Sequence, residues 1–283
     1  MRKVAFIVSR ALIAIAAFSL LAACGGGGSD DNNGGGGSDV SSEFKNDACN
    51  QVGLKIANGF SCSPGEDPAA TSLVLLDILD TNGSIGACSG VVVDSQIVMT
   101  AGHCVQGGVA AILVSTPAGQ QVAATSIAQH PGFRRSGGVL FDDYAFVFVN
   151  QPINSARASI LLSRAPQVGE EVYVAGRGET SQGSGAVDNI FAGAAVIDNV
   201  TDAHIWISFE GNQSHPCGGD SGGPLLIKLG NGNLAVAGLV SQSDPSVDPD
   251  NICKVGDYTI YGNVQAQSVL DFITTFAPNT GVK

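Results

Sequence analysis

Short apolar runs separated by turn residues make up most of the chain beyond residue 70. The runs are rich in Val, Ile, Leu and Phe, and clusters of Gly, Pro, Asn, Asp and Ser lie between them. Many short strands joined by such turns are typical of a β-sandwich or a β-barrel. The pattern predicts strands over residues 72–79, 90–93, 96–100, 110–115, 144–149, 171–175, 204–209, 224–229 and 234–241.

The C-terminal segment has a different periodicity. Residues 263–276 carry apolar side chains at the spacing of one helix face, before Pro278; these are Val264, Val269, Phe272, Ile273 and Phe276. We therefore predict one amphipathic helix at the end of an otherwise all-β chain.

Residues 1–23 have the pattern of an export signal. Arg2 and Lys3 give a positive start, and an apolar run follows over 4–21. Such a run can also form a transmembrane helix, but its position and the small residues after it favour a processed signal peptide. The ending Leu21-Ala22-Ala23-Cys24 resembles a bacterial lipoprotein box, in which Cys24 would be lipid-modified. An ordinary signal peptide that happens to contain a cysteine is the alternative.

The next segment predicts a flexible connection to a folded domain. Residues 25–42 are almost entirely Gly, Ser, Asp and Asn, so they bury too little surface to offset chain entropy. We expect a tether over 24–45, a short propeptide over 46–55 and one domain over 56–283. Gly25 follows Cys24 without an adjacent aspartate, which resembles bacterial sorting to the outer membrane. We therefore expect an exported protein held at the cell envelope, facing the periplasm or the cell surface.

The charge of the chain excludes one class of partner. The sequence has 13 Lys and Arg against 25 Asp and Glu, a formal net charge of −12. Without residues 1–23, which hold three basic residues and no acidic ones, the charge is −15. Contacts to phosphates need Lys and Arg, so we expect no nucleic acid among the partners.

The cysteines indicate an oxidising compartment. Apart from Cys24, the chain has an even number of them, Cys49, Cys62, Cys88, Cys104, Cys217 and Cys253. An even number in an exported chain predicts disulfides. No pair has C-x-x-C spacing and no calcium loop is recognisable, so we expect neither a metal nor an organic cofactor.

Residues 217–224 place one hydroxyl between glycines, in the order Cys-Gly-Gly-Asp-Ser-Gly-Gly-Pro. Glycines let the backbone turn tightly and approach a substrate carbonyl. Ser221 is therefore a candidate nucleophile, and the N–H groups of Gly219 and Ser221 are candidates for an oxyanion hole. A simple Gly-Ser turn is the alternative.

Two further segments supply a base and a carboxylate. Residues 99–104 read Met-Thr-Ala-Gly-His-Cys, and residues 142–148 read Asp-Asp-Tyr-Ala-Phe-Val-Phe. Taken alone, His103 would more often be an ordinary or metal-binding histidine, and Asp142 or Asp143 an ordinary residue before a strand. Together with Ser221 they are the set that acyl transfer to water requires.

The order of histidine, aspartate and serine resembles that of the trypsin/chymotrypsin-like serine endopeptidases. The resemblance covers residues 56 to about 278 and depends on the Thr-Ala-Gly-His-Cys and Gly-Asp-Ser-Gly-Gly-Pro motifs. It implies two packed six-stranded antiparallel β-barrels with a C-terminal helix, and hydrolysis of protein or peptide substrates through an acyl-enzyme. It also implies a triad of His103, Asp143 and Ser221, because Asp143 rather than Asp142 matches the aspartate that leads into the family's strand.

The resemblance further implies two disulfides and an activation switch. The pairs would be Cys88–Cys104, beside the base, and Cys217–Cys253, beside the nucleophile. Lys55-Ile56-Ala57-Asn58-Gly59 is similar to the family's zymogen cleavage site, so the freed ammonium of Ile56 would pair with Asp220. Burying one of these charges without the other is costly, and the pairing therefore acts as a switch.

Cys49 and Cys62 flank this cleavage site. If they pair, the cleaved propeptide and its lipid stay attached to the enzyme. The alternative for Lys55 is an ordinary loop position.

Substrate specificity is less determined by the sequence. His215 stands where a trypsin-like enzyme carries an aspartate at the base of its primary pocket, which argues against a preference for Lys or Arg. Histidine would favour an acidic, polar or aromatic side chain, or serve as a fixed wall. Ser241, Ser243 and Gly256 are expected to contact substrate, although Gln242 and Ser243 replace the family's tryptophan and glycine. Since self-cleavage after Lys55 is then disfavoured, we expect a separate activating protease.

A second class of function is a catalytically inactive homologue that acts as an anchored binding module. Such proteins normally lose a member of the triad, whereas this chain keeps all three residues and the glycines beside them.

Overall fold

The structure is a computed structural model that describes residues 60–62, 71–179, 190–211, 213–246 and 253–282. All of them belong to one compact unit, Gly37–Lys283, and the other unit, Met1–Gly36, lies outside the described residues. The predicted signal peptide, Cys24, tether, propeptide, Cys49 and the Lys55–Ile56 bond also lie outside them. Cys62 is described only as backbone of β1, so its pairing with Cys49 stays a prediction.

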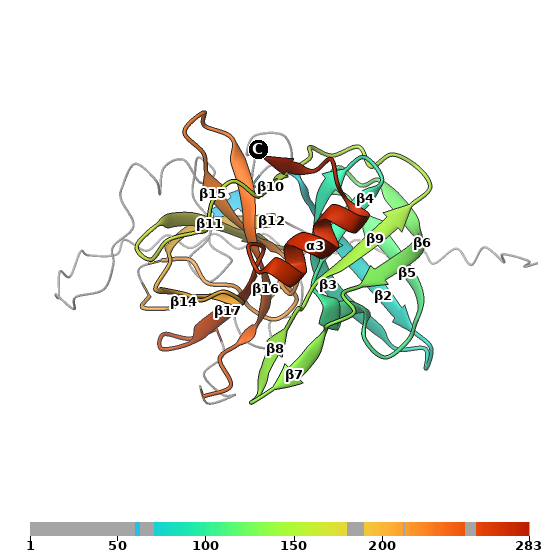
Figure 1. The fold of residues 1–283 in the computed structure, drawn as a ribbon. Coiled ribbons are helices and arrows are strands. Elements are labelled where there is room, and N and C mark those ends of the chain that lie inside the picture. The colour runs from blue at the N-terminus through green and yellow to red at the C-terminus, as the bar shows by residue number, and fades with distance from the viewer. Residues whose placement is uncertain (1–59, 63–70, 180–189, 212, 247–252, 283) are drawn as a thin grey trace, which may run out of the picture. The chain divides into compact units, whose positions relative to one another are not determined.

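Six strands of the first half close into an antiparallel barrel in the order β2-β3-β4-β9-β6-β5 (Figure 1). Alternate residues of a strand face the same side, and in β2 this places Val74, Leu76 and Ile78 in the buried interior. The strands are β2 (Leu73–Asp80), β3 (Ile85–Asp94), β4 (Ile97–Thr100), β5 (Val109–Ser115), β6 (Gln121–Gln129) and β9 (Ala145–Val149).

The second half is a ten-stranded sheet with the path β1-β12-β11-β15-β16-β17-β14-β13; β10 joins it beside β16, and β18 pairs with β10. Its pairs are antiparallel, except that β10 runs parallel to β16 and to β18. The strands are β1 (Phe60–Cys62), β10 (Ser159–Leu161), β11 (Glu171–Gly176), β12 (Ile190–Val196), β13 (Asn199–Val200), β14 (His204–Ser208), β15 (Pro224–Lys228), β16 (Leu234–Ser243), β17 (Tyr258–Asn263) and β18 (Gly281–Val282).

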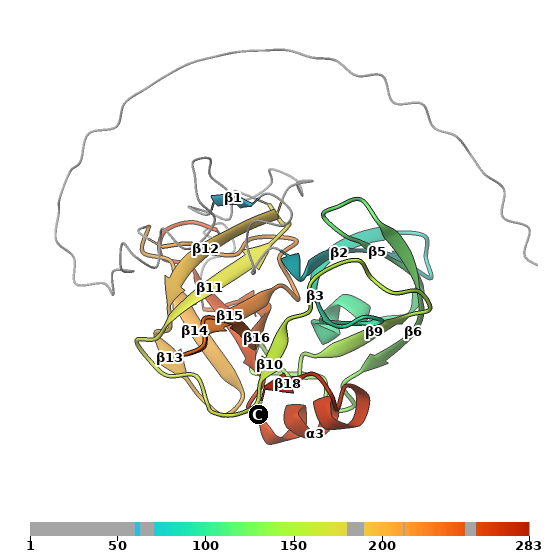
Figure 2. The ribbon, with the colours of Figure 1, turned by 90° about the horizontal axis from the view of Figure 1, so that it is seen from above.

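The C-terminal helix α3 (Gln267–Phe276) packs on the first barrel. Val269, Phe272 and Ile273 are its buried side chains, and the ring of Phe272 stacks on Phe146 of β9 with centroids 5.2 Å apart. Figure 2 shows α3 lying below the first barrel, next to β18. Among the described residues, no helix is long and apolar enough to cross a membrane.

One hydrophobic core continues from the first half into the second. It includes Met99 and Phe146 of the barrel together with Leu225, Val240 and Tyr261 of the sheet. The two halves therefore fold against each other, and loops from both halves come together where they meet. A short 3-10 helix, η1 (Gly102–Val105), and a hairpin of β7 (Arg134–Ser136) and β8 (Val139–Phe141) complete the elements.

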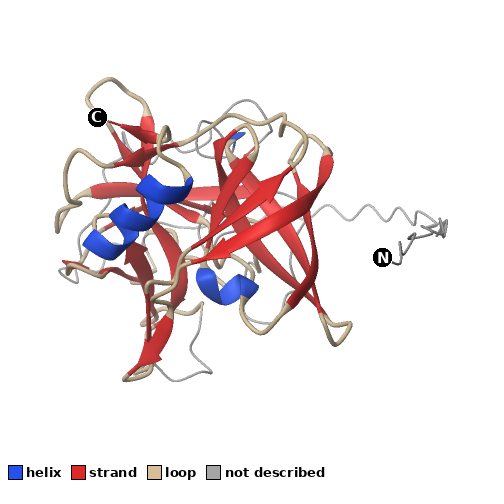
Figure 3. Cartoon of the chain, turned by 45° about the vertical axis from the view of Figure 1, so that its right-hand side comes forward, coloured by secondary structure: helices blue, strands red, loops and turns tan. Residues whose placement is uncertain are grey.

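The predicted fold class is confirmed, because the chain is mostly β with a closed six-stranded barrel and a C-terminal helix (Figure 3). The helix prediction began too early. Residues 258–263 form β17, whose Asn263 still pairs with Gly238, and the helix begins only at Gln267. The sequence pattern also missed β6, because this strand is exposed along one side and carries Gln, Thr and Ser.

Candidate active site

A buried carboxylate holds His103 at the junction of the two halves. Asp143 Oδ2 lies 2.8 Å from His103 Nδ1, and Asp143 Oδ1 accepts the main-chain N–H of His103 at 2.7 Å. The side chain of Asp143 is 1% exposed and that of His103 is 25% exposed. Asp143 therefore fixes both the backbone and the ring of His103, and it favours the tautomer that carries its proton on Nδ1.

The two neighbouring aspartates have different partners. Asp142 has a φ of 52°, and its side chain turns to Arg134 Nη1 at 2.7 Å and to the hydroxyl of Ser268 at 2.5 Å. The structure thus brings Asp143, and not Asp142, to His103.

Ser241 contacts the same carboxylate. Its hydroxyl donates to Asp143 Oδ2 at 2.5 Å, and the residue as a whole is 3% exposed. From the sequence we expect Ser241 to contact substrate, which stays a prediction; the structure adds that its side chain binds Asp143. No local motif could show this, because the two residues are 98 positions apart.

Ser221 lies in a tight turn that is fixed to the first barrel. The main-chain N–H of Ser89 donates to the carbonyl of Ser221 at 2.8 Å. Gly222 has a φ of 79°, and a Cβ there would lie 2.5 Å from the carbonyl oxygen of Ser89. Only glycine allows this close approach, which sets the position of the Ser221 backbone.

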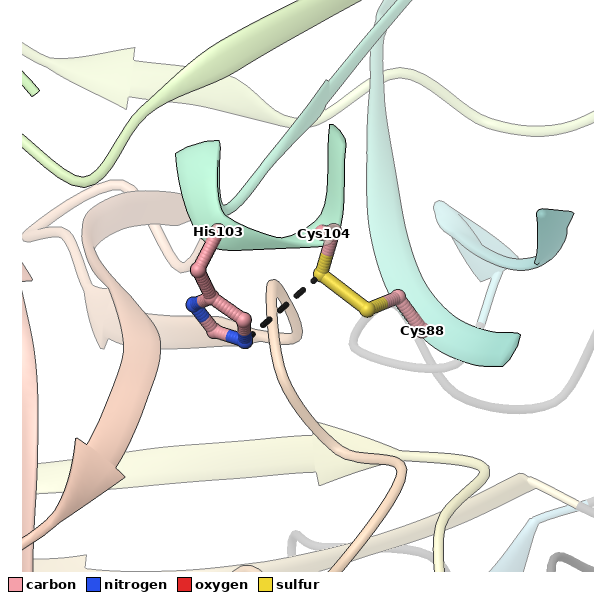
Figure 4. Close-up of side chains that lie close together, drawn as sticks. All are labelled: Cys88, His103 and Cys104. Carbon is pink, nitrogen blue, oxygen red and sulfur yellow. Dashed lines mark hydrogen bonds between the residues drawn. A yellow bond between two sulfur atoms is a disulfide. The ribbon is translucent and has the colours of Figure 1, made fainter. Parts of the chain in front are cut away.

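His103 and Ser221 open into one hollow of about 410 Å³. We call it the catalytic hollow; its lining includes Ile85, Cys88, His103, Cys104, Val109 and Ser221. Within the described residues the hydroxyl of Ser221 has no hydrogen-bond partner. His103 Nε2 instead lies 3.8 Å from Cys104 Sγ (Figure 4). The structure therefore joins His103 to Asp143 and places Ser221 in the same hollow, without a hydrogen bond between His103 and Ser221.

Two backbone donors beside Ser221 are unused. The N–H groups of Asp220, Gly222 and Gly223 each donate to a main-chain carbonyl. Those of Gly219 and Ser221, by contrast, have no acceptor within the described part of the chain. Gly219 has a φ of 89°, and its carbonyl accepts the hydroxyl of Ser89 at 3.2 Å. Free N–H groups two residues apart in such a turn are suited to bind a developing oxyanion.

Asp220 is buried without a cation beside it. It is 1% exposed, and its carboxylate accepts the N–H groups of Gly178 at 2.7 Å and Cys217 at 2.8 Å. Burial raises the pKa of Asp220 to about 7, although both backbone hydrogen bonds act to lower it. No Lys, Arg or His of the described residues pairs with this carboxylate.

The candidate pocket residue His215 forms a second buried pair, with Asp257. His215 and Asp257 are both fully buried, and His215 Nε2 lies 3.1 Å from Asp257 Oδ2. Asp257 also accepts the N–H of Cys253 at 2.8 Å and the hydroxyl of Ser243 at 3.4 Å. The His215 ring stacks on Phe209, and its Nδ1 has no partner within the described residues.

Sequence reasoning missed Asp257, which lies 42 positions from His215 and carries no motif. Ser243, which we expect from the sequence to contact substrate, donates its hydroxyl to Asp257. Gly256, which precedes Asp257 in the chain, is exposed; it has a φ of 96° and open space where a side chain would stand.

Both disulfides implied by the resemblance are present. They are Cys88–Cys104, with Cα atoms 6.3 Å apart, and Cys217–Cys253, with Cα atoms 5.3 Å apart. Cys88, His103 and Cys104 gather their side-chain atoms within 4.8 Å, but the two sulfurs are bonded to each other and are not free to ligate a metal. The disulfides clamp the loops that carry His103 and Ser221.

Comparisons with known proteins agree with this geometry. The family model named Trypsin matches residues 56–273. Human kallikrein-4 is 28% identical over 222 residues, which cover 71% of this chain and 80% of that protein. Trypsin of Sus scrofa is 27% identical over 208 residues, covering 66% of this chain and 84% of that protein.

A solved structure supports the fold. The structure titled HL collagenase aligns with a TM-score of 0.61 at 22% identity, over 80% of this chain and 99% of its own. Together with the paired His103 and Asp143, the two disulfides and the barrel, the match over residues 56–273 shows that the chain belongs to the trypsin family of serine proteases.

Proposed function

We propose that the chain is a serine endopeptidase in which Ser221 is the nucleophile, His103 the general base and Asp143 the residue that orients His103. The observation that carries the proposal is the His103 ring, held by buried Asp143 on one side and open to the hollow of Ser221 on the other. The unused N–H groups of Gly219 and Ser221 add the oxyanion hole that acyl transfer needs. Membership of a protease family implies protein or peptide substrates.

The residues account for each proton in the reaction. Ser221 Oγ attacks the substrate carbonyl while its proton passes to His103 Nε2. The carbonyl oxygen becomes an oxyanion, which accepts hydrogen bonds from the N–H groups of Gly219 and Ser221. His103 then gives this proton to the departing amine, which leaves an ester on Ser221. Water repeats the sequence and releases the acid. Catalytic hydrogen bonds are often long before substrate binds, so the absent His103–Ser221 contact is compatible with this sequence.

Labelling with a fluorophosphonate probe tests the proposal. The chain cleaved after Lys55 should react with the probe and hydrolyse casein, and Ser221→Ala should do neither. Ser163→Ala, an exposed serine outside the site, is the matched control. A wild-type chain that is folded and correctly cleaved, yet neither labels nor hydrolyses, would instead be an inactive homologue that binds its partners.

We also propose that cleavage after Lys55 activates the chain by placing the ammonium of Ile56 against Asp220. The support is the burial of the Asp220 carboxylate, whose partners within the described residues are the N–H groups of Gly178 and Cys217. In the uncleaved folded chain Asp220 keeps its proton up to a pKa of about 7, whereas the ordinary value is 3.8. The folded state thus binds more protons between these values, and its free energy of unfolding falls as pH rises from about 4 to about 7.

Urea unfolding of three proteins checks this switch. The uncleaved chain should lose stability across this pH range relative to uncleaved Asp220→Asn. The cleaved chain should lack that loss, because the ammonium lowers the pKa of Asp220. N-terminal sequencing of the active enzyme should begin at Ile56. Another N-terminus, or the same pH response before and after cleavage, would contradict the proposal.

Anchoring is the last part of the proposal. We propose that the chain is exported and held at the cell envelope, at the outer membrane, by a lipid on Cys24. A separate protease would make the cut, because His215 does not offer the charge that would bind Lys55. Cys24→Ala should move the protein from the membrane fraction to the soluble fraction. If Cys49 pairs with Cys62, the cleaved domain should stay with the membrane until a reductant is added.

A further inference from the structure

The catalytic hollow lies on the side of His103 where a leaving group must be. His103 Nδ1 faces Asp143, and Asp143 in turn binds Ser241 of β16. The opposite nitrogen, Nε2, faces the Cys88–Cys104 disulfide at the wall of the hollow (Figure 4). Because Nε2 delivers the proton to the departing amine, the segment after the scissile bond leaves through this hollow.

The hollow has an apolar lining and an open strand edge. Apolar groups come from Ile78, Ile85, Ala87, Val109 and the disulfide. Ile85 is 75% exposed, so a large apolar side chain stands uncovered at the lip. Among the described residues, 85–87 of β3 pair with β2 alone, since β4 joins β3 from Val91 onward. An extended peptide can therefore add to the free edge of β3 and bury apolar side chains beside it.

The charge at the lip disfavours acidic residues in the leaving segment. Asp80 lines the hollow, and its Oδ1 accepts the N–H groups of Asn82 and Ser84, each at 2.8 Å. These bonds hold the carboxylate in place as part of a turn. A like charge on the substrate would be repelled there.

The acyl side of the site is closed by the side chain of Gln242. The N–H of Asp244 donates to Tyr258 of β17, so the main-chain groups of Ser243, one residue earlier, point to the outer edge of β16. Gln242 Nε2 donates to the carbonyl of Ser243 at 3.2 Å and thereby occupies that edge. An extended peptide that pairs here must first displace this amide.

The same amide joins β16 to the β7–β8 hairpin. Gln242 Oε1 accepts the N–H of Leu140 at 3.0 Å, and its Nε2 also donates to the carbonyl of Gly138 at 3.2 Å. The carbonyl of Leu140 lies 2.7 Å from His204 Nε2, which holds the hairpin from its other side. Displacing the Gln242 side chain thus breaks its three hydrogen bonds, to Leu140, Gly138 and Ser243.

We propose that this chain recognises its substrate mainly on the leaving-group side, through an apolar side chain in the first two residues after the scissile bond. That side chain binds in the catalytic hollow against Ile85. Residues before the one that carries the scissile carbonyl add little, because Gln242 occupies their pairing edge. The inference rests on the proposed endopeptidase activity and names the substrate class of the same site.

Digestion of a peptide library by the cleaved enzyme, read by mass spectrometry, tests the inference. Sequences cut by the wild type should be enriched in Leu, Ile, Val or Phe at the first two positions after the cut, and depleted in Asp and Glu. One cleaved peptide is then shortened residue by residue from either end. Shortening the leaving segment should lower kcat/KM at least tenfold, whereas shortening the acyl segment to its last two residues should change it less than threefold.

Two variants separate the two sides of the site. Ile85→Asp should reduce the preference for Leu over Gly after the cut by roughly 10–100-fold, a range typical of a hydrophobic pocket. Gln242→Ala frees the β16 edge, so acyl-side extension should now raise kcat/KM by about tenfold. Val168→Asp changes another exposed apolar residue, outside the hollow. It should leave the preference for Leu over Gly and the gain from acyl-side extension as in the wild type.

The results also distinguish this inference from the proposed function. If the wild type hydrolyses peptides but gains more from acyl-side than from leaving-side residues, the inference is wrong and the endopeptidase stands. If Ile85→Asp keeps the wild-type preference for Leu, the hollow is not the recognition site. If no peptide is cut and Ser221 is not labelled, the proposed function fails and the inference fails with it.

Discussion

The chain contains two histidine–aspartate pairs with similar chemistry and different surroundings. His103 lies 2.8 Å from Asp143, and its side chain is 25% exposed at the catalytic hollow. His215 lies 3.1 Å from Asp257, and both side chains are fully buried. In the first pair the ring borders the catalytic hollow, whereas in the second pair the whole ring is enclosed.

The comparison shows that access, rather than the pairing itself, distinguishes the proposed catalytic histidine from the enclosed one. A buried aspartate orients the imidazole in both places, so a short histidine–aspartate distance is not evidence of catalysis. The His103 pair also has a hydroxyl and two unused N–H groups in its neighbourhood. The His215 ring is instead packed on Phe209 with centroids 4.9 Å apart. Substitutions in the His103 pair should therefore change the rate of hydrolysis, and substitutions in the His215 pair should change the free energy of unfolding.

The largest expected effect is on the chemistry of the exposed pair. Asp143→Asn should lower kcat by about 10⁴-fold, because the amide favours the wrong tautomer of His103 while keeping its position. The measurement is steady-state hydrolysis of a peptide by the cleaved enzyme. Asp142→Asn, at the neighbouring carboxylate that binds Arg134, should cost less than about tenfold. Equal losses in the two variants would remove Asp143 from the triad.

The enclosed pair should show a loss of stability. His215→Leu leaves the buried Asp257 carboxylate without its histidine partner, which should reduce the free energy of unfolding by about 3–5 kcal/mol. Replacing both residues with Leu should recover much of that loss, because no unpaired charge remains. Urea unfolding measures both variants. A loss below about 1 kcal/mol for the single variant would show that the two side chains do not act as an ion pair.

The smallest expected effect concerns the hydroxyl that supports the exposed pair. Ser241→Ala removes one hydrogen bond to a charged group, worth about 1.5–3 kcal/mol. If Ser241 acts through Asp143, kcat should fall roughly 10–100-fold and the pH profile of kcat should shift, while KM changes little. A rise in KM with unchanged kcat would show instead that Ser241 contacts the substrate. Ser243→Ala, whose hydroxyl reaches Asp257 at 3.4 Å, is the matched control in the enclosed pair.

The pairing of His103 with Asp143 and the place of Ser221 in the same hollow followed from short motifs. His103, Asp143 and Ser221 each lie in a segment whose neighbours also have a physical role. The glycine after Ser221 permits its turn, the cysteine after His103 forms a disulfide, and the strand after Asp143 anchors the carboxylate in the core. Boundaries were less predictable, as the late start of α3 at Gln267 shows, because Tyr258–Asn263 is held in β17 by pairing with β16.

The sequence by itself determined the class of fold, the candidate catalytic residue types, their order and the negative charge. Periodicity, local motifs and composition can be read from the chain without knowing how distant segments meet. Only the tertiary structure decided that Ser241 binds Asp143, that Asp257 accompanies His215 and that Gln242 joins β16 to Leu140 of the β7–β8 hairpin. These contacts join residues 98, 42 and 102 positions apart. Two of these contacts join the ten-stranded sheet to segments of the first half, and the His215–Asp257 contact lies within the second half. Each forms only when distant segments pack together, and the resulting burial decides which polar groups remain accessible for chemistry.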